Sequence, residues 1–227
     1  MYGAEVWGCC RQLGEVEQVQ LRTMRIFLGV GRLHPKVSLL VEMEMLPLEW
    51  VAKLKCMEFW YRVMKLGDER LVKHVAVEAW KQREMKWMKD LRQSIREMGW
   101  GEVKLEDVEK LSNFQLKEML KSCAWREVRA SWEQEMSEKP KLEVLRMIVD
   151  KDCKGRSAQI ESKEVRRMVT KLRGGTAYLR IETGRWKGEG REERKCKECS
   201  VQEVEDAKHF LLKCARWQDK RELIERV

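Results

Sequence analysis

The chain has 227 residues, of which 43% are hydrophobic and 37% charged, and its formal net charge at pH 7 is +9. A chain of this length and composition can bury a sizeable core in one or two domains, so wholesale disorder is not expected. It has no run of eighteen apolar residues, and its N-terminal residues lack the features of a signal peptide. We therefore expect a folded protein with no membrane partner.

The positive charge is concentrated in the last third of the chain. Residues 141–227 carry 23 basic and 16 acidic side chains, a net charge of +7, whereas residues 1–140 carry 24 and 22, a net charge of +2. A localised excess of this kind favours a polyanionic partner. A solvated basic surface without a partner is the alternative explanation.

The chain has only three prolines and is rich in Glu, Lys, Leu, Met and Arg, which favours helices. We expect four long helices, over residues 15–30, 48–66, 71–98 and 114–136. The first has apolar residues on two sides, which predicts that it is largely buried. Cys56 lies on the apolar face of the second, so we expect it in the core and not among metal ligands.

Lys139 and Pro140 mark a predicted boundary between a helical region, 1–139, and a basic region, 140–227. Two shorter helical patterns follow the boundary, and the sequence then becomes rich in glycine and arginine from Gly174 onward. Within this stretch, residues 178–181 have the composition of a short strand.

Three cysteines and a histidine lie within nineteen residues, in the spacing Cys196-x2-Cys199-x9-His209-x4-Cys214. A Cys-x2-Cys turn can direct both sulfurs at one ion, and His-x4-Cys lies within the spacing of structural zinc sites. On an ideal α-helix, His209 and Cys214 would point about 140° apart, so Cys214 must lie where the helix loosens or has ended. Asp206 is the candidate N-cap of that helix. Three buried thiols beside an unrelated histidine are the alternative, but the intervening segment is too polar to favour it.

Four protein ligands would make this a closed structural zinc site and not a catalytic one. In so small a module, zinc binding and folding should be one event, worth on the order of 10 kcal/mol. The other five cysteines cannot all pair with one another, which favours a reducing compartment, the nucleus or the cytoplasm. The predicted fold is mainly α: a helical, bundle-like region followed by a small zinc-knuckle-like module at about residues 176–220.

The C-terminal sequence resembles a known family. The segment LRIETGRWKGEGREERKCKECSVQEVEDAKHFLLKCARW, residues 179–217, is similar to the C-terminal end of reverse transcriptases encoded by non-LTR (LINE-like) retrotransposons, where REER-C-x-x-C, an acidic VED and HFLL-x-C recur. The stretches MYGAEVWG, IFLGV and VEMEMLPLEW are similar to the segment that follows the polymerase in those polyproteins. The resemblance covers essentially the whole chain, and its C-terminal motif is the more specific one.

The resemblance implies that Cys196, Cys199, His209 and Cys214 are zinc-knuckle-like ligands in a region that contacts nucleic acid during target-primed reverse transcription. It also implies a thumb- or linker-like role for residues 1–139 and, as a partner, the polymerase portion of a longer polyprotein. The polymerase site needs adjacent aspartates to hold two metal ions, and none of the seven aspartates here is adjacent to another. We therefore expect no catalysis by this chain.

These observations predict a non-catalytic module that binds RNA, DNA or both through a basic surface organised by zinc. The candidate phosphate-binding residues are Arg166, Arg167, Lys171, Arg173, Arg180, Arg185, Lys187, Arg191, Arg194, Lys195 and Lys197. Trp186 lies between two of these cations and could either stack on a base or cap a small core.

Two other classes of function compete with nucleic-acid binding. The first is a helical scaffold or protein-interaction domain with a purely structural zinc, in which residues 1–140 pack on a polymerase or on another copy. The second is an enzyme, because the Cys-x2-Cys pair is similar to that of zinc deaminases. Those enzymes need a His-x-Glu motif upstream, and none of the three histidines here has one.

Overall fold

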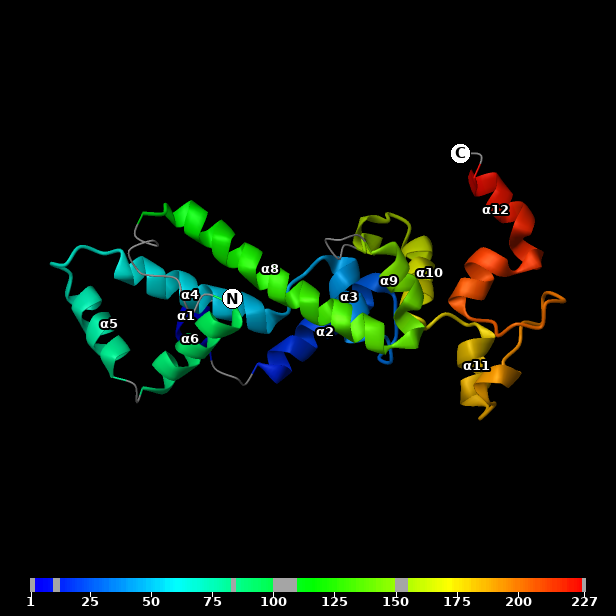
Figure 1. Ribbon diagram of the computed structural model, residues 1–227, viewed down its shortest axis with the longest axis horizontal. Coiled ribbons are helices and arrows are strands. Elements are labelled where there is room, and N and C mark those ends of the chain that lie inside the picture. Colours follow the sequence, from blue (N-terminus) through cyan, green and yellow to red (C-terminus); the bar gives the residue numbers. More distant parts are fainter. Residues whose placement is uncertain (1–2, 10–12, 83–84, 100–109, 150–154, 226–227) are drawn as a thin grey trace. The chain divides into compact units, whose positions relative to one another are not determined.

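The computed structural model describes residues 3–9, 13–82, 85–99, 110–149 and 155–225, which are mainly helical (Figure 1). The chain divides into two compact units: residues 1–20 with 46–131, and residues 21–45 with 132–227. The second unit thus includes a segment from each side of the predicted boundary at Pro140. None of the helices in the described ranges is long and apolar enough to cross a membrane.

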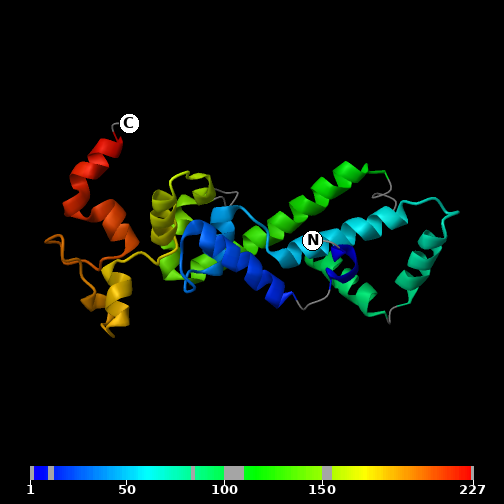
Figure 2. The same cartoon turned by 180° about the vertical axis from the view of Figure 1, so that it is seen from behind.

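In chain order, the α-helices are α1 (Ala4–Trp7), α2 (Gly14–Leu28), α3 (Lys36–Met43), α4 (Leu48–Met64), α5 (Leu71–Lys81), α6 (Lys86–Glu97), α8 (Asn113–Glu138), α9 (Glu143–Ile148), α10 (Lys163–Arg173), α11 (Arg180–Trp186) and α12 (Gln218–Glu225). The same elements are seen from behind in Figure 2. Among the described residues, β pairing is limited to an isolated antiparallel bridge between Lys195 and Val204. The prediction of a mainly α fold is confirmed.

Helix α4 is the centre of the first unit, where it packs against α1, α5 and α6. Its buried residues include Ala52, Cys56, Met57 and Trp60, at the three- and four-residue steps of one helix face. The Cys56 thiol donates a hydrogen bond to the carbonyl oxygen of Ala4 at 3.2 Å. The prediction that Cys56 is a core residue is confirmed.

The predicted single helix over residues 71–98 is wrong, because the backbone is extended at Gln82 and Met85 and separates α5 from α6. The ring of Trp60 on α4 lies 4.8 Å from that of Trp80 on α5 and 6.4 Å from that of Trp87 on α6. On one continuous helix, residues 80 and 87 would be about 10 Å apart along the axis. As two separate helices, α5 and α6 place both rings against Trp60, a tertiary contact that helical periodicity does not reveal.

Helix α2 forms where it was predicted, but only one of its two apolar stripes is buried. Leu21 and Met24 are buried, whereas Val19 and Ile26 are 64% and 69% exposed. The expectation that this helix is largely buried is therefore wrong for the second stripe, because neighbouring helices cover only one side of it.

In the second unit, a buried ion pair joins α3 to α10. Glu42 on α3 is fully buried, and its Oε2 lies 3.3 Å from Nη1 of Arg173 at the end of α10. The same oxygen accepts a hydrogen bond from the N–H of Ser157 at 3.1 Å, and Arg173 also donates to the carbonyl oxygen of Gly155. A buried carboxylate is tolerated only when it is paired and hydrogen-bonded in this way. Arg173 is thus a structural residue of this unit.

His34 is buried in the same unit, between α3 and the end of α10. Its Nε2 lies 2.9 Å from the Ser38 hydroxyl and its Nδ1 lies 2.8 Å from the Thr176 hydroxyl. A Cβ atom at Gly174 would overlap the imidazole, so only glycine allows this approach. Burial, with a smaller contribution from nearby cations such as Lys141, lowers the pKa of His34 to about 3.

We expect this histidine to make folding stability fall in mild acid. Folded His34 stays neutral until the pH approaches 3, whereas in the unfolded chain it binds a proton near pH 6.5. Below pH 6.5 the unfolded state therefore binds more protons, and stability decreases by up to about 1.4 kcal/mol per pH unit down to about pH 3. Urea denaturation at pH 7.5 and 5.5 should show a loss about 1.4 kcal/mol larger in the wild type than in His34→Gln. Equal losses in the two proteins would contradict the assignment.

The predicted strand at residues 178–181 is also wrong, because α11 begins there. The backbone N–H of Arg180 donates to the Glu205 carboxylate at 3.0 Å, and that of Ile181 donates to the Glu205 carbonyl oxygen at 3.0 Å. A carboxylate at a helix N-terminus satisfies its free N–H groups and complements its dipole. This contact from 25 residues away in the sequence favours a helix where the local composition favours a strand.

Candidate metal centre

A short hairpin positions the first two cysteines of the cluster. Lys195 and Val204 form the antiparallel bridge, and the N–H of Cys196 donates to the carbonyl oxygen of Glu203 at 2.9 Å. Cys196 thus lies where the two arms pair, and Cys199 lies in the turn between them. The two-residue spacing lets both sulfurs face the same side of the hairpin.

A π-helical turn, His209–Lys213, positions the other two ligands. The Asp206 carboxylate accepts a hydrogen bond from the N–H of His209 at 2.8 Å, which confirms Asp206 as an N-cap. The N–H of Cys214 donates to the carbonyl oxygen of His209, five residues earlier, at 2.8 Å. A π turn is wider than an α turn, so residues five apart come closer to the same side. The prediction that the helix loosens before Cys214 is confirmed.

The four predicted ligands converge. Their ligand atoms all lie within 4.8 Å of one another; Cys196, His209 and Cys214 are buried and Cys199 is half-buried. The Sγ atoms of Cys196 and Cys214 are 3.9 Å apart, and Sγ of Cys199 is 3.4 Å from Nε2 of His209. In a tetrahedral site with metal–sulfur bonds of about 2.3 Å and metal–nitrogen bonds of about 2.0–2.1 Å, these separations would be about 3.8 and 3.6 Å. The cluster can therefore hold a metal ion.

The environment of the thiols differs between the two hairpin cysteines. Burial raises the pKa of the Cys196 thiol to about 11, although the N–H groups of Glu198 and Cys199 donate to this sulfur and act in the opposite direction. The N–H of Val201 donates to the sulfur of Cys199 and lowers the pKa of that thiol. A coordinating divalent cation deprotonates thiols outright. The backbone N–H groups are already directed at the negative charge that the sulfurs would then carry.

Glu203, which sequence reasoning missed, orients the imidazole ligand. Its Oε2 lies 3.4 Å from Nδ1 of His209, which leaves Nε2 directed at the cluster. Lys213 lies 3.0 Å from the same oxygen and lowers the pKa of the Glu203 carboxyl. A carboxylate on the far ring nitrogen fixes the tautomer and orientation of a metal-binding histidine. In the sequence, the only signal was an acidic residue between the ligand pairs, which does not distinguish Glu203 from Glu205.

We expect Glu203→Gln to weaken metal binding about tenfold, because the amide supports the imidazole less well than the carboxylate does. Competition with a chromophoric chelator would measure the affinity. Glu192→Gln, at an exposed position nearby, is the matched control and should bind the metal as tightly as the wild type. Wild-type affinity in both variants would show that Glu203 does not support the ligand.

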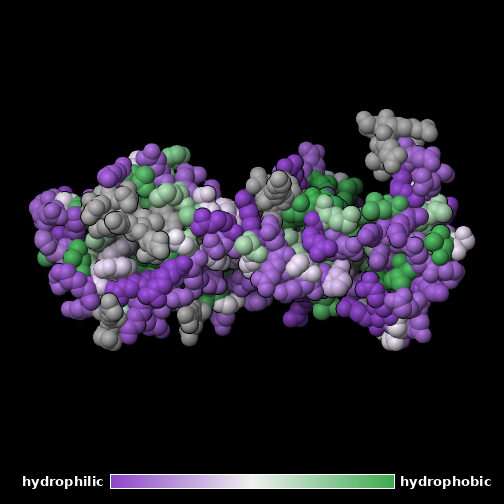
Figure 3. Space-filling model, in the orientation of Figure 1, coloured by the Kyte–Doolittle hydropathy of each residue, from purple (hydrophilic) through white to green (hydrophobic). Residues whose placement is uncertain are grey.

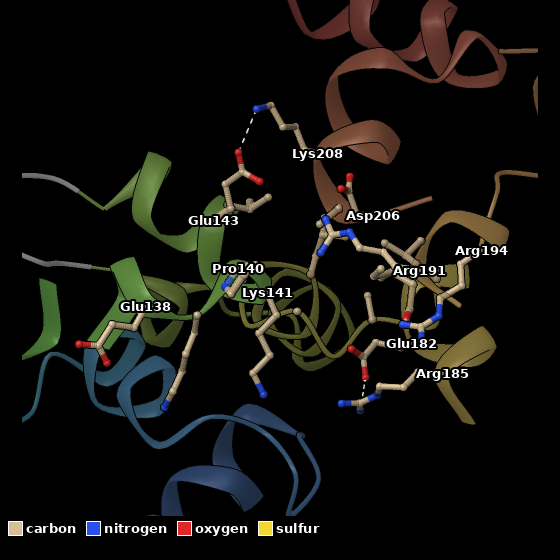
Figure 4. Close-up of a pocket in the computed structure, with 18 residues that line it drawn as sticks. Glu138, Pro140, Lys141, Glu143, Glu182, Arg185, Arg191, Arg194, Asp206 and Lys208 are labelled. Carbon is tan, nitrogen blue, oxygen red and sulfur yellow. Dashed lines mark hydrogen bonds and ion pairs between the residues drawn. The ribbon is translucent and has the colours of Figure 1, made fainter. Parts of the chain in front are cut away.

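A pocket of about 410 Å³ lies in the second unit next to this module (Figure 4). Its basic lining residues are Lys139, Lys141, Arg185, Arg191, Arg194 and Lys208. Lys208 pairs with Glu143 at 2.9 Å and Arg185 pairs with Glu182 at 2.6 Å, the two contacts dashed in Figure 4. In the described part of the chain, the side chains of Lys141 and Arg191 make no ion pair or hydrogen bond. Lys141 was not predicted, because it lies in a helical pattern without a basic cluster.

Four of the eleven predicted phosphate-binding residues make intramolecular contacts within the second unit: Arg166, Arg173, Arg180 and Arg194. Arg180 forms a bidentate ion pair with Glu189, at 2.7 and 3.3 Å. Arg194 donates to the carbonyl oxygens of Ile181 and Glu189, and Arg166 donates to that of Phe27 and lies over its ring. Each of these four guanidinium groups thus donates at least one hydrogen bond within the protein.

The remaining seven include Arg185, which pairs with Glu182, and six cations whose side chains make no ion pair or hydrogen bond to any described residue. These six, the unpaired cations, are Arg167, Lys171, Lys187, Arg191, Lys195 and Lys197. Lys171 is half-buried and the other five are exposed. Sequence alone could not separate them from the structural arginines, because pairing depends on the tertiary contacts.

On the face shown in Figure 3, hydrophilic residues predominate and hydrophobic residues occur in separate groups.

Comparisons of the chain with protein-family models, with curated proteins and with solved structures gave no match. The resemblance to retrotransposon reverse transcriptases therefore stays a prediction from the sequence motifs. The geometry by itself gives a mainly helical chain with a Cys₃His cluster that can bind a metal ion.

Proposed function

We propose that this chain is a non-catalytic, nucleic-acid-binding module from the C-terminal region of a non-LTR retrotransposon reverse transcriptase, with a structural zinc ion at Cys196, Cys199, His209 and Cys214. The observation that carries the proposal is the convergence of these four ligand atoms within 4.8 Å, next to a sequence segment rich in unpaired cations. The sequence motifs supply the family, and the intramolecular contacts supply the choice of nucleic-acid-binding residues.

The donor set supports zinc as the metal. Three thiolates and one imidazole are softer ligands than the oxygen donors that Mg²⁺ and Ca²⁺ require, and this combination is common in structural zinc sites. Because all four positions are taken by protein, no position is open for a water or a substrate, as a catalytic zinc would need. The ion would hold the hairpin and the π-helical turn together and supply no reaction chemistry.

The placement of the unpaired cations supports a polyanionic partner. Lys187, Arg191, Lys195 and Lys197 lie within eleven residues and lead into the cluster, with Lys195 and Lys197 on the metal-binding hairpin itself. A bound ion would fix the backbone that carries them. Contacts of lysine and arginine with phosphate position a nucleic acid but carry little sequence information.

A salt titration tests the proposal. If all six unpaired cations contact phosphates of a single-stranded nucleic acid, the logarithm of the binding affinity should fall with the logarithm of the salt concentration at a slope near −4. We expect this slope in fluorescence anisotropy with a 20-nucleotide single-stranded RNA or DNA between about 50 and 300 mM KCl. A slope near zero for the wild type would remove the proposal.

A charge-matched pair of variants tests which residues are responsible. Lys187→Ala/Lys195→Ala/Lys197→Ala should make the slope less steep by about 2, because three phosphate contacts are lost. Arg96→Ala/Lys117→Ala/Lys121→Ala removes three exposed charges from the first unit and should leave the slope unchanged. The same decrease in both variants would mean that net charge alone, and not this segment, determines binding.

A second candidate function, a protein-interaction domain, is favoured by α5. None of its residues is buried, and Leu71, Val72 and Val75 are 75%, 56% and 60% exposed. Exposed apolar residues that gather on one element are typical of an interaction surface. If this surface binds another copy of the chain, sedimentation should show an association that Leu71→Glu/Val75→Glu abolishes without changing the salt slope. A monomer at all concentrations would contradict self-association.

A further inference from the structure

Tyr178 and Trp186 form an exposed aromatic pair at the two ends of α11. Their ring centroids are 5.7 Å apart, with an angle of 58° between the planes. Tyr178 is 84% exposed and Trp186 is 58% exposed. Tryptophan and tyrosine usually stabilise a fold by being buried, and these two rings are not. Adjacent large apolar groups that remain exposed to water are typical of a ligand-binding surface.

The backbone that presents this pair is held from both sides. On one side, the carboxylate and the carbonyl oxygen of Glu205 accept hydrogen bonds from the first N–H groups of α11. On the other, Arg194 donates a hydrogen bond to the carbonyl oxygen of Ile181 at 3.0 Å. A Cβ atom at Gly184 would overlap the side chains of Glu189 and Arg194, so the helix lies directly against the segment that leads into the metal cluster. A surface that is fixed before binding loses less conformational entropy when a ligand arrives.

The charges around the pair favour an anionic ligand. Arg185 and Lys187 flank Trp186 in the sequence, and Lys187 makes no ion pair among the described residues. The nearest acidic residues of the helix and the following turn, Glu182 and Glu189, are both paired with arginines. A ligand with flat apolar faces and evenly spaced negative charges could stack on the two rings and pair with the neighbouring cations at the same time.

We infer that Tyr178 and Trp186 are a stacking platform for unpaired bases of a single-stranded nucleic acid; this rests on the proposed function and specifies the form of its ligand. Base–aromatic stacking combined with a basic surface is the general way in which single strands are bound without sequence preference. In a duplex the base faces are covered by neighbouring base pairs, so the platform selects single strands over duplexes. An anionic membrane has no such rings to stack and is the alternative ligand.

The test uses the full, metal-loaded chain with a mixed-sequence 20-nucleotide RNA, presented either as a single strand or as a duplex. Trp186→Ala should weaken single-strand binding about tenfold at every salt concentration, because stacking is lost. The salt slope and the duplex affinity should not change. Lys187→Ala should instead make the slope less steep by about 0.7 for the single strand, as expected for one phosphate contact.

Two further measurements distinguish stacking from a structural role. Trp186→Phe and Tyr178→Phe keep aromatic faces and should retain most of the single-strand affinity, and all variants should keep the wild-type metal content. If Trp186→Ala binds the single strand like the wild type while the wild-type slope stays near −4, the platform is refuted and the proposed function stands. Equal weakening for single strand and duplex, or binding to phosphatidylserine vesicles with the same loss in Trp186→Ala, would also overturn the inference.

Discussion

Removal of the proposed zinc ion should unfold residues 195–214 and leave the helices of the first unit protected. Cys196, His209 and Cys214 are themselves the buried residues of this segment, and its hairpin has a single β bridge. Without an ion, the hairpin and the π-helical turn would be joined mainly by the contacts of Glu203 with His209 and Lys213, and the ion pair with Lys213 is exposed and therefore weak. Metal binding worth on the order of 10 kcal/mol would exceed the stability of so small a module, so binding and folding should be one event.

Hydrogen exchange of the zinc-loaded chain, before and after chelation, would measure this effect. Amide protection over residues 195–214 should disappear on chelation, while protection in α4 should persist. Native mass spectrometry should find one zinc per chain in the wild type and none in His209→Ala. His74→Ala, which alters an exposed histidine on α5, is the matched control and should keep the zinc. Unchanged protection in the metal-free chain would show that the cluster is held by packing alone.

Arg173→Met should destabilise the second unit by about 3–5 kcal/mol. Methionine replaces the aliphatic part of the arginine side chain but leaves the fully buried Glu42 carboxylate without its cation. Part of the loss should return in the double variant Glu42→Gln/Arg173→Met, because the amide carries no charge to desolvate. Urea denaturation would measure each free energy of unfolding.

Arg167→Met is the control for this prediction. Arg167 lies on the same helix, is exposed, and has no ion pair among the described residues, so its replacement should change stability by about 0.5 kcal/mol or less. A loss of less than about 1 kcal/mol in Arg173→Met would show that the ion pair contributes little to the fold. The sequence predicted that both arginines bind phosphate. The comparison tests whether Arg173 is instead a structural residue, while Arg167 stays a candidate phosphate-binding residue.

Local patterns in the sequence determined the features that depend on neighbouring residues. The three- and four-residue steps of apolar side chains predicted α4 and α8, because an amphipathic helix is specified within a few turns. The ligand spacing predicted the metal cluster, and the angle between residues five apart predicted that the helix would loosen before Cys214. The N-cap at Asp206 could also be predicted from local sequence, because the N–H group that it accepts belongs to His209, only three residues away.

The tertiary structure decided the features that depend on contacts between distant segments. The ring of Trp60 contacts those of Trp80 on α5 and Trp87 on α6, which are 20 and 27 residues further along the chain. Glu205, 25 residues from Arg180, accepts hydrogen bonds from the first two N–H groups of α11. Glu42 and Arg173, 131 residues apart, show why composition could not sort structural arginines from unpaired cations. A charged side chain looks the same in the sequence in either case, and only folding brings its partner within hydrogen-bonding distance.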